Sequence, residues 1–148
     1  RIRMIEELKK YKHITEGQVK FHEVDSLNFV HNLQYMYYFE WARIKYLEEI
    51  GYPVEALSMM QDNYLMVVHQ EADFMGSAKF FDKYEVFTRT AKIGVSSITV
   101  ENLLKIKDGD VITKGKAVFV NLNVQTRLPE TISSELKEKI RKYEGIKL

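Results

Sequence analysis

The spacing of apolar and polar residues divides the chain into one long helix and several strands. Between residues 32 and 50, apolar side chains recur every three or four positions, which predicts a helix over Asn32–Ile50. Gly51 and the nearby Pro53 are typical stop signals for such a helix. Its apolar residues form two adjacent stripes, so we expect other elements to cover most of its surface. Glu40 and Arg43 lie three residues apart and are expected to pair, within the helix or across a dimer.

The rest of the pattern predicts strands. Five segments are strand-like, namely Ile14–Val24, Tyr64–Phe74, Lys83–Ile93, Ser96–Ile106 and Val111–Val124. Asp108-Gly109 predicts a tight turn between the last two, and the later segments follow one another closely, which favours an antiparallel meander. Residues 54–63 are expected to be irregular or helical, and Leu136–Tyr143 is expected to form a short helix.

This order of elements, one strand, a long helix and then about four strands, is typical of an α+β domain. The simplest way to bury the wide apolar face of the helix is to wrap a curved antiparallel sheet around it. The 148 residues contain no repeat, low-complexity tract or linker, so we expect a single domain over residues 1–148. Residues 1–13 are expected to form a short helix or an N-terminal arm.

Composition and charge exclude several classes of function. The chain has no cysteine, which rules out disulfides, thiol catalysis and cysteine-bound zinc, and is compatible with a cytoplasmic location. A formal net charge of +1 gives no reason to expect a nucleic acid or a membrane surface as the partner. The sequence has no apolar run of the roughly 18 residues that a membrane span needs, and its charged N-terminal stretch does not resemble a signal peptide. His13, His22 and His69 lack ligand spacing and are interpreted as surface or strand residues, so we expect no metal site.

The candidate chemistry lies where the first strand-like segment meets the long helix. Asp25 ends that segment, a polar turn containing Asn28 follows, and the helix is expected to open at about His31–Asn32. A helix N-terminus presents unpaired backbone N–H groups and a partial positive charge. A carboxylate that faces such amides can split a thioester or an ester, because the amides stabilise the oxyanion of the transition state.

The residues of this region also resemble a known family. The pattern D-x-x-x-x-V-H-N-x-x-Y-x-x-x-F-E-x-A-R, from Asp25 to Arg43, is similar to the hydroxybenzoyl-CoA thioesterase branch of the hotdog-fold acyl-CoA thioesterases. Three later segments also fit that family, namely Phe80-Phe81-Asp82, Ile93-Gly94-Val95-Ser96-Ser97 and Gly115-Lys116-Ala117. The similarity extends over roughly residues 14–141, and the stretch from Asp25 to Arg43 is its specific part.

The resemblance implies a sheet wrapped around the central helix and an enzyme that hydrolyses acyl-CoA, or acyl carrier protein, thioesters. It implies no metal and no cofactor beyond the CoA of the substrate. It also implies a homodimer or homotetramer with active sites at the dimer interface. The chain departs from the family pattern at Asn28, where relatives have glycine, and at Gln34, where many have asparagine or serine. Asn28 is expected to keep the turn because asparagine tolerates a left-handed backbone.

Several roles stay open at this point. Asp25, at the family's catalytic position, could act as nucleophile or as general base, or could merely cap the helix. Asn32 stands where the family's backbone amide binds the thioester carbonyl, although the amide of His31 or Leu33 could serve, and Asn32 could be an N-cap. His31 could orient Asp25, contact the acyl group or protonate the leaving thiolate, or could be structural.

Several residues outside this segment or within the helix are candidates for contacts with the substrate. Tyr35 is a candidate wall of the acyl pocket, and Ser96 and Ser97 could contact the pantetheine arm or the thioester from a partner subunit. Candidate cations for the CoA phosphates are Lys92, Lys83 and Arg127. The other aromatic residues of the helix are expected to lie in the core or the pocket wall, namely Tyr37, Tyr38 and Trp41.

Two alternatives to a thioesterase remain. Hotdog hydratases and dehydratases place an aspartate near a histidine, and Asp25 with His31 superficially matches that arrangement. A non-catalytic acyl-CoA binder could use the same fold, although loss of the carboxylate would be its expected mark and Asp25 is present.

Overall fold

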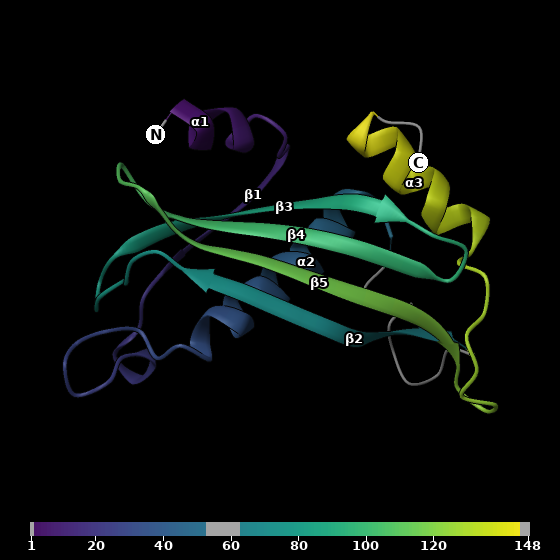
Figure 1. The fold of residues 1–148 in the computed structure, drawn as a ribbon, viewed down its shortest axis with the longest axis horizontal. Helices are drawn as coiled ribbons and strands as arrows, with labels where there is room; N and C mark the ends of the chain where they lie inside the picture. Colours follow the sequence, from purple (N-terminus) through teal and green to yellow (C-terminus); the bar gives the residue numbers. More distant parts are fainter. Residues whose placement is uncertain (1, 53–62, 146–148) are drawn as a thin grey trace.

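The structure is a computed structural model that describes residues 2–52 and 63–145, so the expectation for residues 54–63 falls almost entirely outside the described chain. Within these ranges, five strands form one antiparallel sheet: β1 (His13–Gln18), β2 (Asn63–Phe74), β3 (Lys83–Ile93), β4 (Ser97–Ile106) and β5 (Val111–Asn123). The helices are α1 (Ile2–Leu8), a one-turn 3-10 helix at Phe21–Glu23, the long α2 (Gln34–Glu49) and α3 (Ser134–Glu144). Figure 1 shows the sheet curving across α2, which confirms the predicted α+β class.

The strands follow the spatial order β1-β3-β4-β5-β2. β3, β4 and β5 form the predicted meander, and a turn at Asp108 (φ 59°) joins the last two. The prediction that β2 also belongs to the meander is wrong, because β2 pairs with β5 at the far edge. β1 already occupies the side of β3 that β2 would need, with His13 opposite Thr88 and Gln18 opposite Lys83. β2 therefore has one paired side and one open side in the described chain.

The two faces of the sheet bury different helices. Val86 and Leu104 pack against α2, whose buried residues include Phe39 and Ala42. The alternating positions Phe87 and Leu103 point the other way, where Tyr11 and the partly buried Met4 and Leu8 cover them. Gly115 lets the helix approach closely, since a Cβ there would stand 2.5 Å from the Phe39 ring. The Phe39 side chain thus fills space that only a glycine leaves open.

A cluster of polar side chains ties α3 to the C-terminal end of α2. The Tyr46 hydroxyl donates to Glu144 at 2.6 Å and lies 2.9 Å from the Thr90 hydroxyl. His13 is 5% exposed, and its Nδ1 lies 2.5 Å from a Glu49 carboxylate oxygen. His13 is thus a strand residue as predicted, but a buried one with a structural partner.

Three further expectations need correction. The strand predicted over Ile14–Val24 ends at Gln18, because β3 begins at Lys83 and offers no partner beyond that pair. Glu40 and Arg43 form no ion pair within α2 in the described chain; instead the Arg43 guanidinium lies 5.1 Å from the centre of the Phe119 ring, and a pair across a dimer stays a prediction. Along α2, two aromatic residues expected to be covered are exposed, Tyr37 by 64% and Trp41 by 54%.

Candidate active site

The carboxylate of Asp25 is held by its own loop. The Asp25 Oδ1 atom accepts hydrogen bonds from the backbone N–H groups of Leu27 (2.9 Å) and Phe29 (3.1 Å). The Asp25 N–H in turn donates to the Phe29 carbonyl at 2.8 Å, which closes the loop. Within the described chain the Oδ2 atom has no hydrogen-bond partner, and the residue is exposed. One oxygen therefore orients the carboxylate and the other is available for chemistry. The alternative that Asp25 caps the helix is wrong.

The same loop is fastened to the start of α2. Val24 and Val30 form an antiparallel bridge, and the His31 N–H donates to the Glu23 carbonyl at 3.0 Å. A turn follows in which the Gln34 N–H donates to the His31 carbonyl at 2.8 Å. The helix begins at Gln34, two residues later than predicted, because this turn precedes it. The chain thus leads from Asp25 to the helix start through a short, hydrogen-bonded loop.

The backbone amides before the helix differ in what they already bind. The His31 N–H is used by Glu23, and the Leu33 N–H lies 3.3 Å from the Nδ1 atom of its neighbour His31. In the described chain, no partner is found for the Asn32 N–H. The N-cap residue is Leu33, without a side-chain cap, so the alternative of Asn32 as N-cap is wrong. Of the three amides left open by the sequence, the amide of Asn32 is the one whose N–H group is not engaged.

His31 lies on the exposed side of this turn. Its ring nitrogen Nδ1 faces the Leu33 amide, and no contact with the Asp25 carboxylate is found among the described residues. An orienting role of His31 toward Asp25 therefore has no support from the geometry of this chain. Its proposed contact with the acyl group or leaving thiolate stays a prediction.

Glu23 is a site residue that the sequence analysis missed. Its carboxylate is buried, with the residue 7% exposed, and it accepts from the Lys20 N–H at 2.8 Å and the Tyr38 hydroxyl at 2.9 Å. The side-chain amide of Gln34 donates to its second oxygen at 3.1 Å. Burial, and then the hydrogen bond to Glu23, raise the pKa of Tyr38, so its hydroxyl stays protonated and donates. Glu23 therefore connects the segment before Asp25 to the first two turns of α2.

This contact also gives the departure at Gln34 a structural role. A glutamine side chain at the first residue of α2 reaches the Glu23 carboxylate, whereas a shorter asparagine or serine would carry its polar atoms closer to the backbone. No local pattern could have indicated the contact, because Glu23 and Gln34 are 11 residues apart and Glu23 and Tyr38 are 15 apart.

Asn28 behaves as the sequence analysis expected. It has a φ of 66°, in the left-handed region that glycine and asparagine tolerate best, so this prediction is confirmed. Its side chain adds a contact that glycine could not make, since Oδ1 accepts from the Phe80 N–H at 3.1 Å. A bridge between Phe29 and Lys79 joins the same two segments. The Asp25 loop is thus tied to the link between β2 and β3.

The predicted substrate contacts do not all lie near Asp25. Tyr35 is 2% exposed and its hydroxyl accepts from the Ala78 N–H at 3.0 Å, so its polar atom already has a partner. Ser96 lies in the turn between β3 and β4, Ser97 is the first residue of β4, and Lys92 is exposed near the end of β3. Figure 1 shows this turn at the opposite end of the sheet from the loop that carries Asp25. Arg127 lies in the turn that follows β5, whereas Lys83, at the start of β3, is on the Asp25 side.

A cavity of about 290 Å³ lies between the C-terminal half of α2 and the strands β2, β4 and β5. Its lining is mostly apolar, and the polar groups at its wall include Glu40 and Arg43. Burial lowers the pKa of Arg43. Because Tyr46 and Ile140 also line it, the cavity belongs to the end of the helix away from Asp25 and adds no wall to the Asp25 loop of the same chain.

The described residues show neither a metal cluster nor a membrane-spanning helix. Within residues 2–52 and 63–145, no three His, Asp or Glu side chains are grouped so that they could hold a metal ion. In the same ranges, every helix is too short or too polar to cross a membrane.

A family model, a curated relative and a solved structure are similar to most of this chain. The profile of the thioesterase-like superfamily matches residues 19–140. The uncharacterized protein YsmA of Bacillus subtilis (strain 168) is 25% identical over 123 residues, which are 81% of this chain and 79% of that protein. The solved structure of a thioesterase from Thermus thermophilus, complexed with coenzyme A and Zn, is 27% identical with a TM-score of 0.80, covering 94% of this chain and 99% of that one.

A second solved structure supports the fold alone. Slr0204, a 1,4-dihydroxy-2-naphthoyl-CoA thioesterase from Synechocystis, is 16% identical with a TM-score of 0.81, and the match covers 86% of this chain and 94% of that one. The hotdog arrangement expected from the resemblance, a sheet wrapped around a central helix, is therefore confirmed.

Proposed function

Since this chain belongs to the thioesterase-like superfamily, we propose that it hydrolyses an acyl-CoA thioester to a free acid and CoA-SH. The observation that carries the proposal is that the short hydrogen-bonded segment from Asp25 to α2 holds two groups without a hydrogen-bond partner in the described chain, the Asp25 Oδ2 atom and the Asn32 N–H. The solved thioesterase with coenzyme A bound supports CoA as the thiol half of the substrate. An acyl carrier protein thioester is the alternative form of the same substrate.

Each group has a defined task in this reaction. The Asn32 N–H donates to the thioester carbonyl oxygen and stabilises the negative charge that forms there. Asp25 either attacks the carbonyl carbon, expelling CoA thiolate and forming a mixed anhydride that water then cleaves, or removes a proton from the attacking water. In both routes water supplies the new oxygen of the acid and the thiolate leaves as CoA-SH after taking up a proton. Neither route needs a metal or a further cofactor.

The test is release of free thiol from a panel of acyl-CoAs, from acetyl to palmitoyl and including benzoyl and hydroxybenzoyl. We expect turnover of at least one member, unchanged after dialysis against EDTA. Hydration of crotonyl-CoA without thiol release would instead identify a hydratase. Saturable binding of acyl-CoA with neither reaction would identify a binder.

We further propose that the enzyme works as a homodimer or a larger oligomer. Among the described residues, β2 has one edge without a strand partner, and its exposed apolar side chains include Met66, Val68 and Phe74. Leu33, the N-cap residue, and Tyr37 and Trp41 of α2 form a second exposed apolar stripe at a spacing of four residues. An open edge strand and apolar stripes of this size are rarely left uncovered in soluble proteins.

A second copy could also bring the β3–β4 end of its sheet close to the Asp25 loop of the first copy. Ser96, Ser97 and Lys92 are remote from Asp25 in one chain, so they could reach its substrate only from a neighbouring copy. We expect light scattering to give a mass of at least twice 17.5 kDa at micromolar concentration. A monomer with full thioesterase activity would contradict this assembly. A cytoplasmic location stays a prediction from composition.

A further inference from the structure

An unusual group of aromatic side chains lies beside the Asp25 loop. The rings of Phe80 and Phe81 stack with centroids 4.1 Å apart, and Phe21 meets Phe80 edge-on at 5.6 Å. Phe21 is 77% exposed and Phe81 is 65% exposed. Three exposed lysines flank these rings in sequence, namely Lys20, Lys79 and Lys83, and they take part in none of the ion pairs found in the described chain. We call the three phenylalanines the aromatic cluster.

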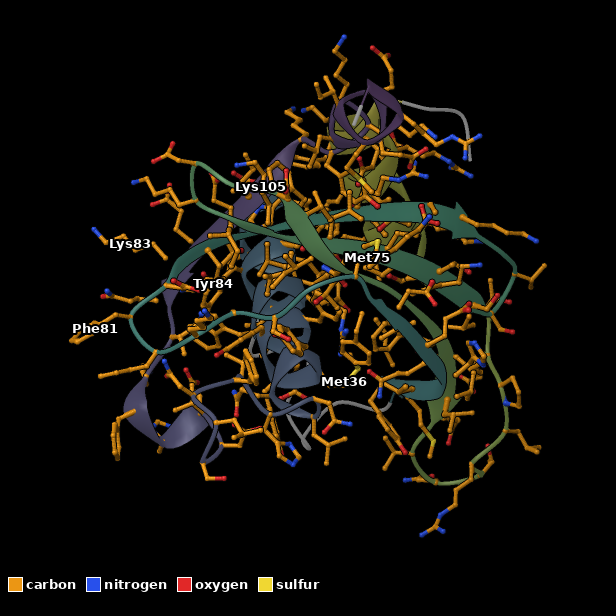
Figure 2. All side chains as sticks on the ribbon, turned by 60° about the vertical axis from the view of Figure 1, so that its left-hand side comes forward. Met36, Met75, Phe81, Lys83, Tyr84 and Lys105 are labelled. Atoms are coloured by element: carbon orange, nitrogen blue, oxygen red, sulfur yellow. The ribbon has the colours of Figure 1, made fainter. Side chains whose placement is uncertain are left out.

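Phe81 is held outward in an unfavourable backbone conformation. It has a φ of 73°, and the Asp82 N–H donates to the Lys79 carbonyl at 3.0 Å, so Phe81 is the third residue of a tight turn. Glycine or asparagine usually occupies such a position, and a bulky residue there is an outlier. Figure 2 shows Phe81 and Lys83 projecting from the same edge of the molecule.

Several hydrogen bonds enforce this turn. The Phe81 N–H donates to the Val19 carbonyl at 3.2 Å, the side-chain amide of Gln18 donates to the Phe81 carbonyl at 3.0 Å, and the Lys79 N–H donates to the Asp82 carboxylate at 2.8 Å. The fold therefore retains a strained residue whose ring contributes little to the core. Strained conformations of this kind gather at ligand-binding sites, where the strain is retained for function.

We infer that the aromatic cluster binds the adenine ring of coenzyme A and that the flanking lysines bind its phosphates. An exposed ring surface suits a flat base, because bases stack on aromatic faces without enclosure, whereas an acyl chain needs an enclosed apolar pocket. The three exposed lysines, which are adjacent in sequence to the rings and form no ion pair within the described residues, suit the phosphates that adjoin the adenine in this ligand. Asp82 is the acidic residue of the turn, and its carboxylate already accepts a hydrogen bond from the Lys79 N–H.

The position of the cluster fits this assignment, which rests on the proposed function. Phe80 donates its N–H to Asn28, and Lys79 bridges to Phe29, so the cluster and the Asp25 loop share one backbone framework. A ligand that stacks on the cluster would extend its thioester toward Asp25 across this framework. The cluster would then favour CoA thioesters over substrates that lack the nucleotide.

The test compares Phe81→Gly with the wild type on two substrates that share one acyl group, the CoA thioester and the N-acetylcysteamine thioester. Glycine relieves the strain and removes the ring, so we expect an unchanged or higher melting temperature and a KM for the CoA thioester raised about tenfold. We expect an unchanged kcat and an unchanged KM for the N-acetylcysteamine thioester. Phe81→Tyr, the matched control, should retain the wild-type KM.

Other outcomes would overturn the inference. Equal effects on both thioesters, or no effect on either, would show that the ring does not bind the nucleotide. A changed mass in light scattering would show that the cluster is a subunit contact. Calorimetric titration with adenosine 3′,5′-bisphosphate separates this inference from the proposed function, because binding that depends on Phe81 supports the inference even in a protein that hydrolyses no thioester, and its absence contradicts it.

Discussion

Replacing Asp25 with asparagine is expected to lower kcat for the preferred acyl-CoA by roughly 10³-fold while the fold persists. The amide oxygen of asparagine can still accept the Leu27 and Phe29 N–H groups that now bind Oδ1, so the loop should keep its shape. What disappears is the carboxylate oxygen without a partner, which is the only part of the side chain that either proposed route uses. The measurement is thiol release at saturating substrate, with circular dichroism and melting temperature to confirm folding.

The comparison needs a variant that loses the same charge elsewhere. Asp108→Asn is suitable, since Asp108 lies in an exposed turn with a φ of 59°, a conformation that asparagine tolerates well. It should keep wild-type turnover. Wild-type turnover by Asp25→Asn would remove Asp25 from the mechanism. Rapid quenching with labelled acyl-CoA decides between the two routes, because label trapped on the wild-type enzyme indicates a nucleophile and its absence indicates a general base.

The fold and part of the site were accessible from the sequence because they depend on local patterns. The period of the apolar residues located α2 and the strands β2 to β5 to within two residues, and the turn chemistry of asparagine indicated the positive φ of Asn28. Asp25 and the helix start lie nine residues apart, so one motif contains both.

What could not be predicted depends on contacts between distant segments. The period of a strand tells which side chains share a face, but it does not tell which strand lies next to it, and so β2 was misplaced in the sheet. In the same way, the pattern of α2 shows that Tyr37 and Trp41 are apolar, but not that the sheet of the same chain leaves them exposed. The sequence pattern makes Glu23 one more polar residue of a predicted strand, because its partners on α2 lie 11 and 15 residues away.

Glu23 is accordingly the residue whose replacement we expect to have the second large effect. Glu23→Ala removes the acceptor of three hydrogen bonds and leaves the buried Tyr38 hydroxyl without its partner, which should lower the free energy of unfolding by about 3 kcal/mol. Because Glu23 joins the Asp25 loop to α2, we also expect kcat to fall by roughly 10-fold to 100-fold even where the protein is fully folded. We regard Glu23 as a positioning residue, since nothing indicates that it touches substrate.

Two further variants separate positioning from mere stability. Glu23→Gln keeps an acceptor for Lys20 and Tyr38, and the side-chain amide of Gln34 can turn to accept from it, so both stability and kcat should largely return. Adding Tyr38→Phe to Glu23→Ala removes the unpaired hydroxyl and should restore part of the stability without restoring kcat.

Glu16→Ala, at an exposed position of β1, controls for loss of a carboxylate and should leave kcat unchanged. If kcat of Glu23→Ala equalled that of the wild type at a temperature where both are folded, Glu23 would be structural only, and the link between the Asp25 loop and α2 would have no part in catalysis.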